Sequence, residues 1–97
     1  MKIIWSPLAV ERLENIYKYI FKDNPVAAGN LIKRIIDKVE SLSENPERGR
    51  NVPEANNPAV KEIFEGEYRI IYRIKSKKII ILSVRSFRQL LKGKDVQ

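Results

Sequence analysis

The sequence predicts an α+β fold, with two antiparallel helices packed on an antiparallel β-sheet in the order β-α-α-β-β-β. Three observations indicate this class. Apolar residues recur every three or four positions in two stretches before residue 43, the next segment is rich in proline and asparagine, and the apolar period then changes to two. Because 97 residues suffice for one hydrophobic core, residues 1–97 are expected to form a single domain.

The N-terminal half predicts a short strand followed by a helical hairpin. Residues 2–5 are apolar and end at Ser6-Pro7. Ser6-Pro7 and Asn24-Pro25 each place a capping residue before a proline that suits the first helical turn. The expected apolar stripes are Ala9, Leu13, Ile16, Tyr17, Ile20 and Phe21 in the first helix and Ala28, Leu31, Ile32, Ile35, Val39 and Leu42 in the second. The residues expected to face solvent on the first helix are Glu11, Arg12, Glu14, Asn15 and Lys18.

The C-terminal half predicts three strands after a polar loop over residues 43–58. The strands are expected at residues 60–64, 68–74 and 79–85, with a turn at 75–78. Alternation along the second strand sets apolar and aromatic side chains on one face and arginines on the other. We expect the apolar face to meet the helices.

The last hairpin allows two registers, and the burial of charge decides between them. A two-residue loop would place Tyr68 beside Arg85 on the buried face, where an unpaired charge is costly. A three-residue loop at residues 76–78 is therefore expected, with Arg69 beside Arg85 on an open face that is free of helices. The partners in this register are Ile74 with Ile80, Tyr72 with Leu82 and Ile70 with Val84, all facing the helices, while Ile71, Arg73, Ile81 and Ser83 share the open face.

Positive charge is concentrated in the second half of the chain. The sequence carries 19 Lys+Arg against 12 Asp+Glu, and residues 61–97 hold ten of the former and four of the latter. Because adjacent guanidinium groups repel, arginines crowded on an open sheet face favour an anionic or acidic partner. Local neutralisation by Glu62, Glu65 and Glu67 is the alternative.

Several chemistries are excluded by composition. The chain has no Cys and no His, which excludes disulfides, Cys/His zinc sites, thiol nucleophiles and His-dependent dyads. We expect no metal, no cofactor and no small-molecule substrate. The longest apolar run, residues 79–82, is too short to span a bilayer, and the N-terminus is unlike a signal peptide. A soluble, cytoplasmic protein without membrane contact is therefore expected.

A series of short motifs runs in order along residues 3–90. They are Trp5-Ser6-Pro7-x-Ala9, Leu13-x-x-Ile16-x-x-Tyr19-Ile20, Asn24-Pro25-x-Ala27-Ala28, Asn45-Pro46-x-x-Gly49-Arg50, Val52-Pro53-Glu54, the strand Tyr68–Ile74 and Arg88. Their order and spacing resemble the RelE/ParE superfamily of toxins from type II toxin–antitoxin modules, and its ParE-like branch in particular. The resemblance implies a small basic toxin that a cognate antitoxin neutralises.

The resemblance implies one of two targets. ParE-like toxins poison DNA gyrase, whereas RelE-like toxins cut mRNA in the ribosomal A site with Lys and Arg residues and a C-terminal Tyr or His. For the cutting reaction, Arg69, Arg88 and Lys61 would stabilise the charge that builds on the phosphate. This chain has Ser86 where many relatives carry His, and neither Tyr nor His follows Arg88.

That departure favours gyrase inhibition by protein contact, without catalysis by the toxin. The residues expected to bind the target are Arg69, Arg73, Arg85, Arg88, Leu90, Leu91 and Lys92. A ribosome-dependent mRNA endonuclease remains the first alternative, in which case the chain is an enzyme. An inactive basic domain that binds nucleic acid is the second alternative.

Overall fold

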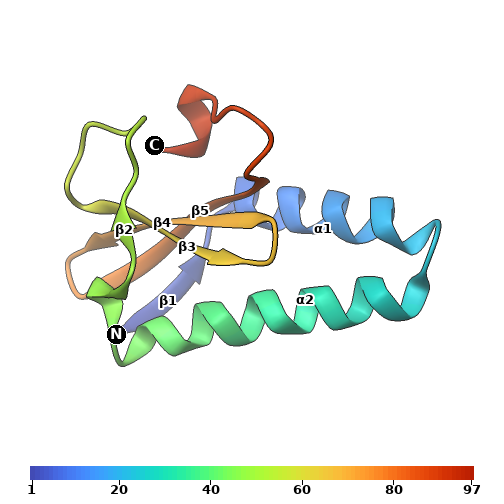
Figure 1. The fold of residues 1–97 in the computed structure, drawn as a ribbon. Helices are drawn as coiled ribbons and strands as arrows, with labels where there is room; N and C mark the ends of the chain where they lie inside the picture. Colours follow the sequence, from blue (N-terminus) through green and yellow to red (C-terminus); the bar gives the residue numbers. More distant parts are fainter.

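The computed structural model describes residues 1–97 and contains two helices on one face of a five-stranded sheet (Figure 1). The helices are α1 (Pro7–Phe21) and α2 (Pro25–Glu40). The strands are β1 (Lys2–Trp5), β2 (Arg50–Asn51), β3 (Val60–Glu65), β4 (Tyr68–Lys75) and β5 (Lys78–Ser86). Short 3₁₀ turns lie at Ser41–Ser43, Pro46–Arg48 and Gly93–Asp95. The predicted α+β class is confirmed.

The strands follow the order β1-β5-β4-β3-β2 across the sheet. Strand β1 pairs with β5 in parallel, while the other neighbours are antiparallel. The prediction of an antiparallel sheet is therefore wrong for β1, which precedes the helices, forms one edge of the sheet and runs parallel to β5. Strand β2, which pairs Arg50 with Glu62 and Asn51 with Lys61, lies inside the segment expected to be only loop.

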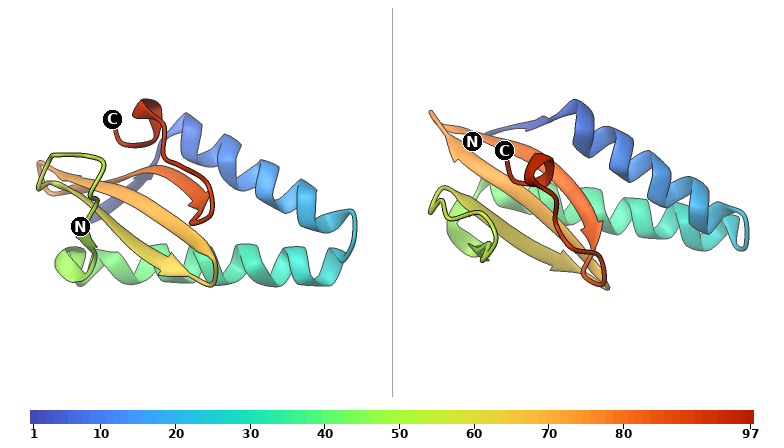
Figure 2. Two further views of the ribbon diagram at one scale, coloured as in Figure 1. Left: turned by 45° about the horizontal axis from the view of Figure 1, so that its top comes forward. Right: turned by 90° about the horizontal axis from the view of Figure 1, so that it is seen from above.

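Both predicted helix starts are confirmed. The Ser6 hydroxyl accepts a hydrogen bond from the Ala9 N–H, and the Asn24 side chain accepts one from the Ala27 N–H. The hairpin extends beyond the sheet (Figures 1 and 2). For that reason Tyr17 and Phe21, expected in the buried stripe, stay partly exposed and contact each other with ring centroids 5.5 Å apart.

The turn between β4 and β5 has two residues, not the predicted three. Ser76 and Lys77 both have positive φ, 50° and 62°, as a two-residue hairpin turn of this kind requires. A β-bulge at Leu82 then corrects the register, so that Tyr72 pairs with Ile81 but Ile71 pairs with Ser83. Beyond the bulge Ile70 pairs with Val84 and Arg69 with Arg85, as predicted.

The two-residue turn and the bulge together change which residues of β5 face the helices: the turn sets Ile79, Ile80 and Ile81, and the bulge sets Leu82. Ile79 and Ile81 join the core under the helices, whereas Ile80 and Leu82 belong to a second apolar group on the opposite face. The predicted orientations of Ile80, Ile81 and Leu82 are therefore wrong. Tyr72 is fully buried under the helices, as expected.

The face away from the helices, named here the loop face, is covered and not open. Residues 50–58 lie over one side of it, and the C-terminal residues 91–96, named the tail, lie over the other (Figure 2). They bury Ile71 and Leu82 in an apolar group that includes Val52 and Val60, with Leu91 and Val96 packed against it. Neither helix of the chain has the length and apolar character that crossing a membrane requires.

Candidate target-binding surface

Arg69 lies on the loop face, but it is only 7% exposed and each nitrogen of its guanidinium donates a hydrogen bond to a carboxylate. Its Nε donates to Glu62 Oε1 at 2.6 Å, and its two Nη atoms donate to the two carboxylate oxygens of Glu54 at 3.0 Å. Arg50 Nε donates to the other Glu62 oxygen at 2.7 Å. These four residues, the Arg69 cluster, hold two positive and two negative charges.

The pairing is reflected in the ionisation of the cluster. The bidentate hydrogen bond from Arg69 holds the pKa of Glu54 below its usual range, although burial opposes the shift. The same bond to Glu54 raises the pKa of Arg69 further above its usual value. The expectation that Arg69 is an exposed cation awaiting a partner is wrong, because its charge is already neutralised within the chain.

Arg85 belongs to a second group on the same face, the Asp95 cluster, with Arg12, Ser83 and Asp95. The Asp95 carboxylate is fully buried and accepts hydrogen bonds from the Ser83 hydroxyl at 2.6 Å and the Lys92 N–H at 2.8 Å. Arg12 Nη2 lies 3.2 Å and Arg85 Nε 4.0 Å from its oxygens. Burial would raise the pKa of Asp95, but these hydrogen bonds and positive charges together lower it.

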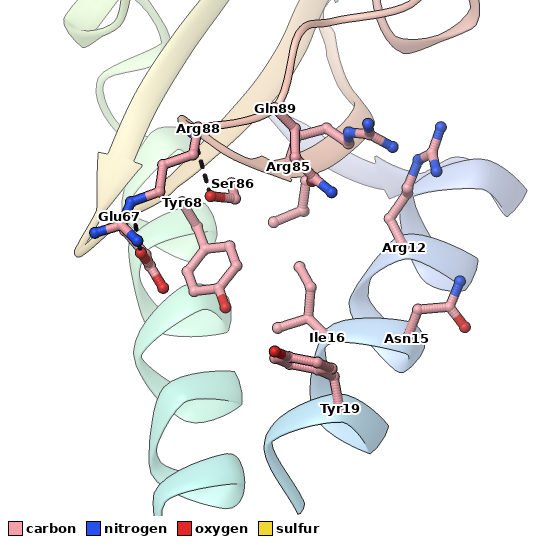
Figure 3. A pocket seen from close by; sticks show the side chains of 11 residues that line it. Arg12, Asn15, Ile16, Tyr19, Glu67, Tyr68, Arg85, Ser86, Arg88 and Gln89 are labelled. Carbon is pink, nitrogen blue, oxygen red and sulfur yellow. Dashed lines mark hydrogen bonds and ion pairs between the residues drawn. The ribbon is translucent and has the colours of Figure 1, made fainter.

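A groove of about 450 Å³ opens between α1 and the ends of β4 and β5 (Figure 3). Arg12 and Arg85 lie on one side of it, and Arg88 lies on the other side next to Glu67. The rings of Tyr19 and Tyr68 project into the space between the two elements. Burial, more than the nearby Glu67 charge, raises the pKa of Tyr68, so its hydroxyl stays protonated at neutral pH.

The segment after β5 is the most exposed part of the predicted surface. The Arg88 side chain is 76% exposed, with Glu67 at 3.7 Å and the Phe87 ring beneath its guanidinium at 5.9 Å. Leu90 is 87% exposed, and Lys92 is also exposed. Leu91, by contrast, packs on the loop face.

The remaining predicted residues are less accessible. Arg73 is half-buried, and its Nε is buried without a hydrogen-bond partner. The Lys61 side chain is 14% exposed; it lies 3.4 Å from a Glu47 oxygen and donates a hydrogen bond to Asn51.

Lys61 and Arg69 point to opposite faces of the sheet. Successive strand residues alternate between faces. On β3, Glu62 contacts Arg69 on the loop face, whereas Ile63 packs under the helices, so that Lys61 shares the helix side with Ile63. The three residues considered for phosphate chemistry, Lys61, Arg69 and Arg88, are therefore not assembled around one point, and each has a carboxylate partner.

Sequence reasoning missed Arg12 and the groove tyrosines. Arg12 was expected in solvent, but its side chain is only 16% exposed because it reaches over the edge of β5 to Asp95. Helical periodicity places Arg12 among Glu11, Glu14 and Asn15, and it carries no signal of a contact with the C-terminus. Tyr68 packs against the core, as expected, and its ring also lines the groove where the sheet ends.

Comparisons with known proteins agree with this fold. Residues 3–91 match the family described as the ParE toxin of the type II toxin–antitoxin system parDE. A Sinorhizobium fredii (strain NBRC 101917 / NGR234) protein named as toxin Y4kP is 36% identical over 90 residues, covering 91% of this chain and 90% of that protein.

Two solved structures share the architecture. The chromosomal ParDE system from P. aeruginosa superposes with a TM-score of 0.74 at 24% identity, over 89% of this chain and 95% of that chain. The toxin–antitoxin complex RelBE2 from Mycobacterium tuberculosis superposes with a TM-score of 0.64 at 19% identity, over 88% of this chain and 95% of that chain. Together with the family match over nearly the whole sequence, these likenesses show that the chain belongs to the ParE toxin family of type II toxin–antitoxin systems, within the RelE/ParE superfamily.

Proposed function

We propose that this toxin inhibits DNA gyrase in the cytoplasm through protein contact, without catalysing a reaction itself, and that a cognate antitoxin neutralises it. The choice of gyrase over mRNA rests on one observation: the three cations considered for mRNA cleavage, Lys61, Arg69 and Arg88, do not lie around a common point. Lys61 and Arg69 face opposite sides of the sheet, and Arg69 is held by two carboxylates. Cleavage by a ribonucleotide's own 2′-OH requires positive charge converging on one phosphate.

The proposed contact with gyrase is the groove of Figure 3 and the segment that follows β5. Three side chains there are exposed, Phe87, Arg88 and Leu90. Exposed aromatic, arginine and large apolar residues at the rim of a concave surface are typical of protein interfaces. Of the predicted target-binding set, Arg88 and Leu90 belong to this contact, whereas Arg69 supports the fold.

The proposal of an antitoxin partner rests on family membership and charge. Both structural neighbours are described as toxin–antitoxin systems. The chain carries a formal net charge of +7, and it exposes Val10, Phe21 and Val26 on the helical hairpin. A basic protein with exposed apolar side chains suits an acidic, amphipathic partner.

Two assays with the purified full chain test the target. Gyrase is expected to accumulate cleaved DNA complexes when the toxin is added, and Arg88→Glu is expected to reduce this accumulation about tenfold or more because it reverses the charge at the contact. The matched control is Lys75→Glu, the same charge change at the other end of the β4–β5 hairpin, where the side chain is exposed.

Each alternative has its own outcome. If gyrase is unaffected and primer extension on ribosomes shows cuts within codons, the chain is an mRNA endonuclease and the proposal is wrong. If induced expression causes no growth arrest, the inactive nucleic-acid-binding alternative replaces it.

A further inference from the structure

The tail lies on the loop face through side chains alone. Its backbone hydrogen bonds are local, from the Asp95 N–H to Lys92 and from the Val96 N–H to Gly93, and none reaches the sheet. Leu91 and Val96 pack on the apolar group that includes Leu82, and Asp95 is buried beside Ser83. A segment held in this way can dissociate without breaking any strand pairing.

The polar contacts between the tail and the rest of the chain hold more positive than negative charge. Arg12 and Arg85 supply two positive charges, and the structure places one carboxylate, Asp95, between them. Arg12 Nε, Arg12 Nη2 and Arg85 Nε are buried without a hydrogen bond. Buried donors are nearly always paired, and an unpaired one lowers stability. The two guanidiniums therefore retain capacity for an anion that approaches more closely than Asp95 does.

The Arg69 cluster shows what a completed arginine site looks like in the same protein. Arg69 receives a bidentate carboxylate at 3.0 Å and a second carboxylate at 2.6 Å. Arg85 Nε, its neighbour on β5, lies 4.0 Å from the one carboxylate it faces. The difference indicates that Asp95 occupies the second site incompletely.

We propose that Arg12, Ser83 and Arg85, with the apolar surface around Leu82, form a binding site for a partner protein's segment that carries an aspartate or glutamate between apolar residues. The toxin's own tail is an internal ligand that competes for this site. The tail itself defines the chemistry, since it presents a carboxylate flanked by Leu91 and Val96 to these residues. The proposed site does not depend on which molecule the toxin poisons.

The test uses a fluorescently labelled peptide with the sequence of residues 89–97 and full-length protein variants. Asp95→Asn weakens the contact between the tail and the two arginines. This variant is therefore expected to bind the peptide with an affinity about tenfold or more above that of the wild type. Adding Arg85→Gln is expected to abolish the gain, and a peptide with Asn at the position of Asp95 is expected to bind about tenfold more weakly. Asp37→Asn, the same change at an exposed carboxylate, is the control and is expected to match the wild type.

Hydrogen exchange provides an independent measurement. The amides of residues 91–96 are expected to exchange faster in Asp95→Asn than in the wild type, with β4 and β5 unchanged. If Asp95→Asn does not fold, Val96→Ser retains every charge and is expected to raise peptide affinity in the same direction.

Three results would overturn the proposal. The first is unchanged peptide affinity in both variants. The second is unchanged exchange of the tail amides in the folded variant. The third is binding of a single-stranded RNA oligonucleotide, but not of the peptide, to Asp95→Asn.

Discussion

The loop face is covered by two segments that are attached in different ways. Residues 50–58 are held by the Arg69 cluster and by pairing of β2 with β3. The preceding residues 46–49 are held from the helix side of the sheet by the Tyr72 hydroxyl, which accepts from the Gly49 N–H at 3.0 Å and donates to the Pro46 carbonyl at 2.7 Å. The tail is held by one carboxylate and two apolar side chains, without backbone pairing to the sheet. The first segment is tied to the sheet by backbone pairing, whereas the second contacts it through side chains alone.

The comparison separates two arginines that are direct neighbours on adjacent strands. Arg69 and Arg85 pair across β4 and β5. Arg69 is in a balanced cluster of two cations and two carboxylates, whereas Arg85 shares one carboxylate with Arg12. The partners supplied by distant segments, and not the position on the sheet, decide which arginine is structural and which remains available.

The largest expected effect is that of Tyr72→Ala. Removing a fully buried aromatic side chain is expected to lower the free energy of unfolding by about 3–5 kcal/mol, because it leaves a cavity and removes both hydrogen bonds to residues 46–49. Urea denaturation followed by circular dichroism measures this loss. If the hydrogen exchange of the tail increases as much as that of residues 46–58, the two segments are not independent.

Arg69→Ala is expected to lower the free energy of unfolding by about 3 kcal/mol, since the buried Glu62 then has one cationic partner fewer. Exchange of the amides in residues 50–58 is expected to increase with it. The control is Arg88→Ala, which removes an exposed arginine whose ion pair contributes less than about 0.5 kcal/mol. Equal stability of the two variants would mean that the Arg69 cluster does not hold the loop.

Gly49→Ala sharpens the comparison without changing any charge. A Cβ at this position would lie 2.5 Å from the Tyr72 hydroxyl and 2.8 Å from the Glu62 carbonyl oxygen, so the loop has to shift. We expect the free energy of unfolding, measured by urea denaturation, to decrease by about 1–3 kcal/mol. The control is Gly29→Ala in α2, where a Cβ meets nothing within 4 Å and stability is expected to rise slightly. A neutral Gly49→Ala would show that the loop adapts freely.

Acid is expected to weaken both attachments. The pKa values of Glu54 and Asp95 are lowered in the folded protein, so their stabilising contribution is complete above the unfolded values of about 4 and is lost as pH falls through the lowered folded values. The urea concentration at the midpoint of unfolding is therefore expected to decrease as the pH is lowered below about 4. Glu54→Gln and Asp95→Asn should each flatten this dependence, and an unchanged slope in either variant would exclude that carboxylate as a contributor.

The elements that short-range chemistry determines were predictable from sequence. The N-cap residues Ser6 and Asn24 mark the starts of the two helices. Alternation along Tyr68–Ile74 places Tyr72 in the core and Arg69 on the other face. The parallel pairing of β1 with β5 has no such local signal.

Contacts between distant segments were not predictable. The turn residues Ser76 and Lys77 lack the Gly or Asn that usually marks a two-residue turn, and nothing in the sequence of β5 marks the bulge at Leu82. The coverage of the loop face depends on Glu54 and Asp95, which lie far along the chain from their partners on the sheet or helix. Arg69 and Arg85 were therefore assigned to the correct face, but they were expected to be exposed and are instead largely buried beside carboxylates.

The bulge at Leu82 and the two-residue turn compensate each other. The turn is one residue shorter than the pairing of Arg69 with Arg85 requires, and the bulge supplies that residue within β5. Deleting Leu82 alone would remove the extra residue and leave a regular ladder, in which Ile81 still pairs with Tyr72 and Ser83 with Ile71. Lengthening the turn by one residue while deleting Leu82 is a paired insertion and deletion that should leave the far half of the hairpin in its native alignment, and relatives with a longer turn are expected to lack the bulge.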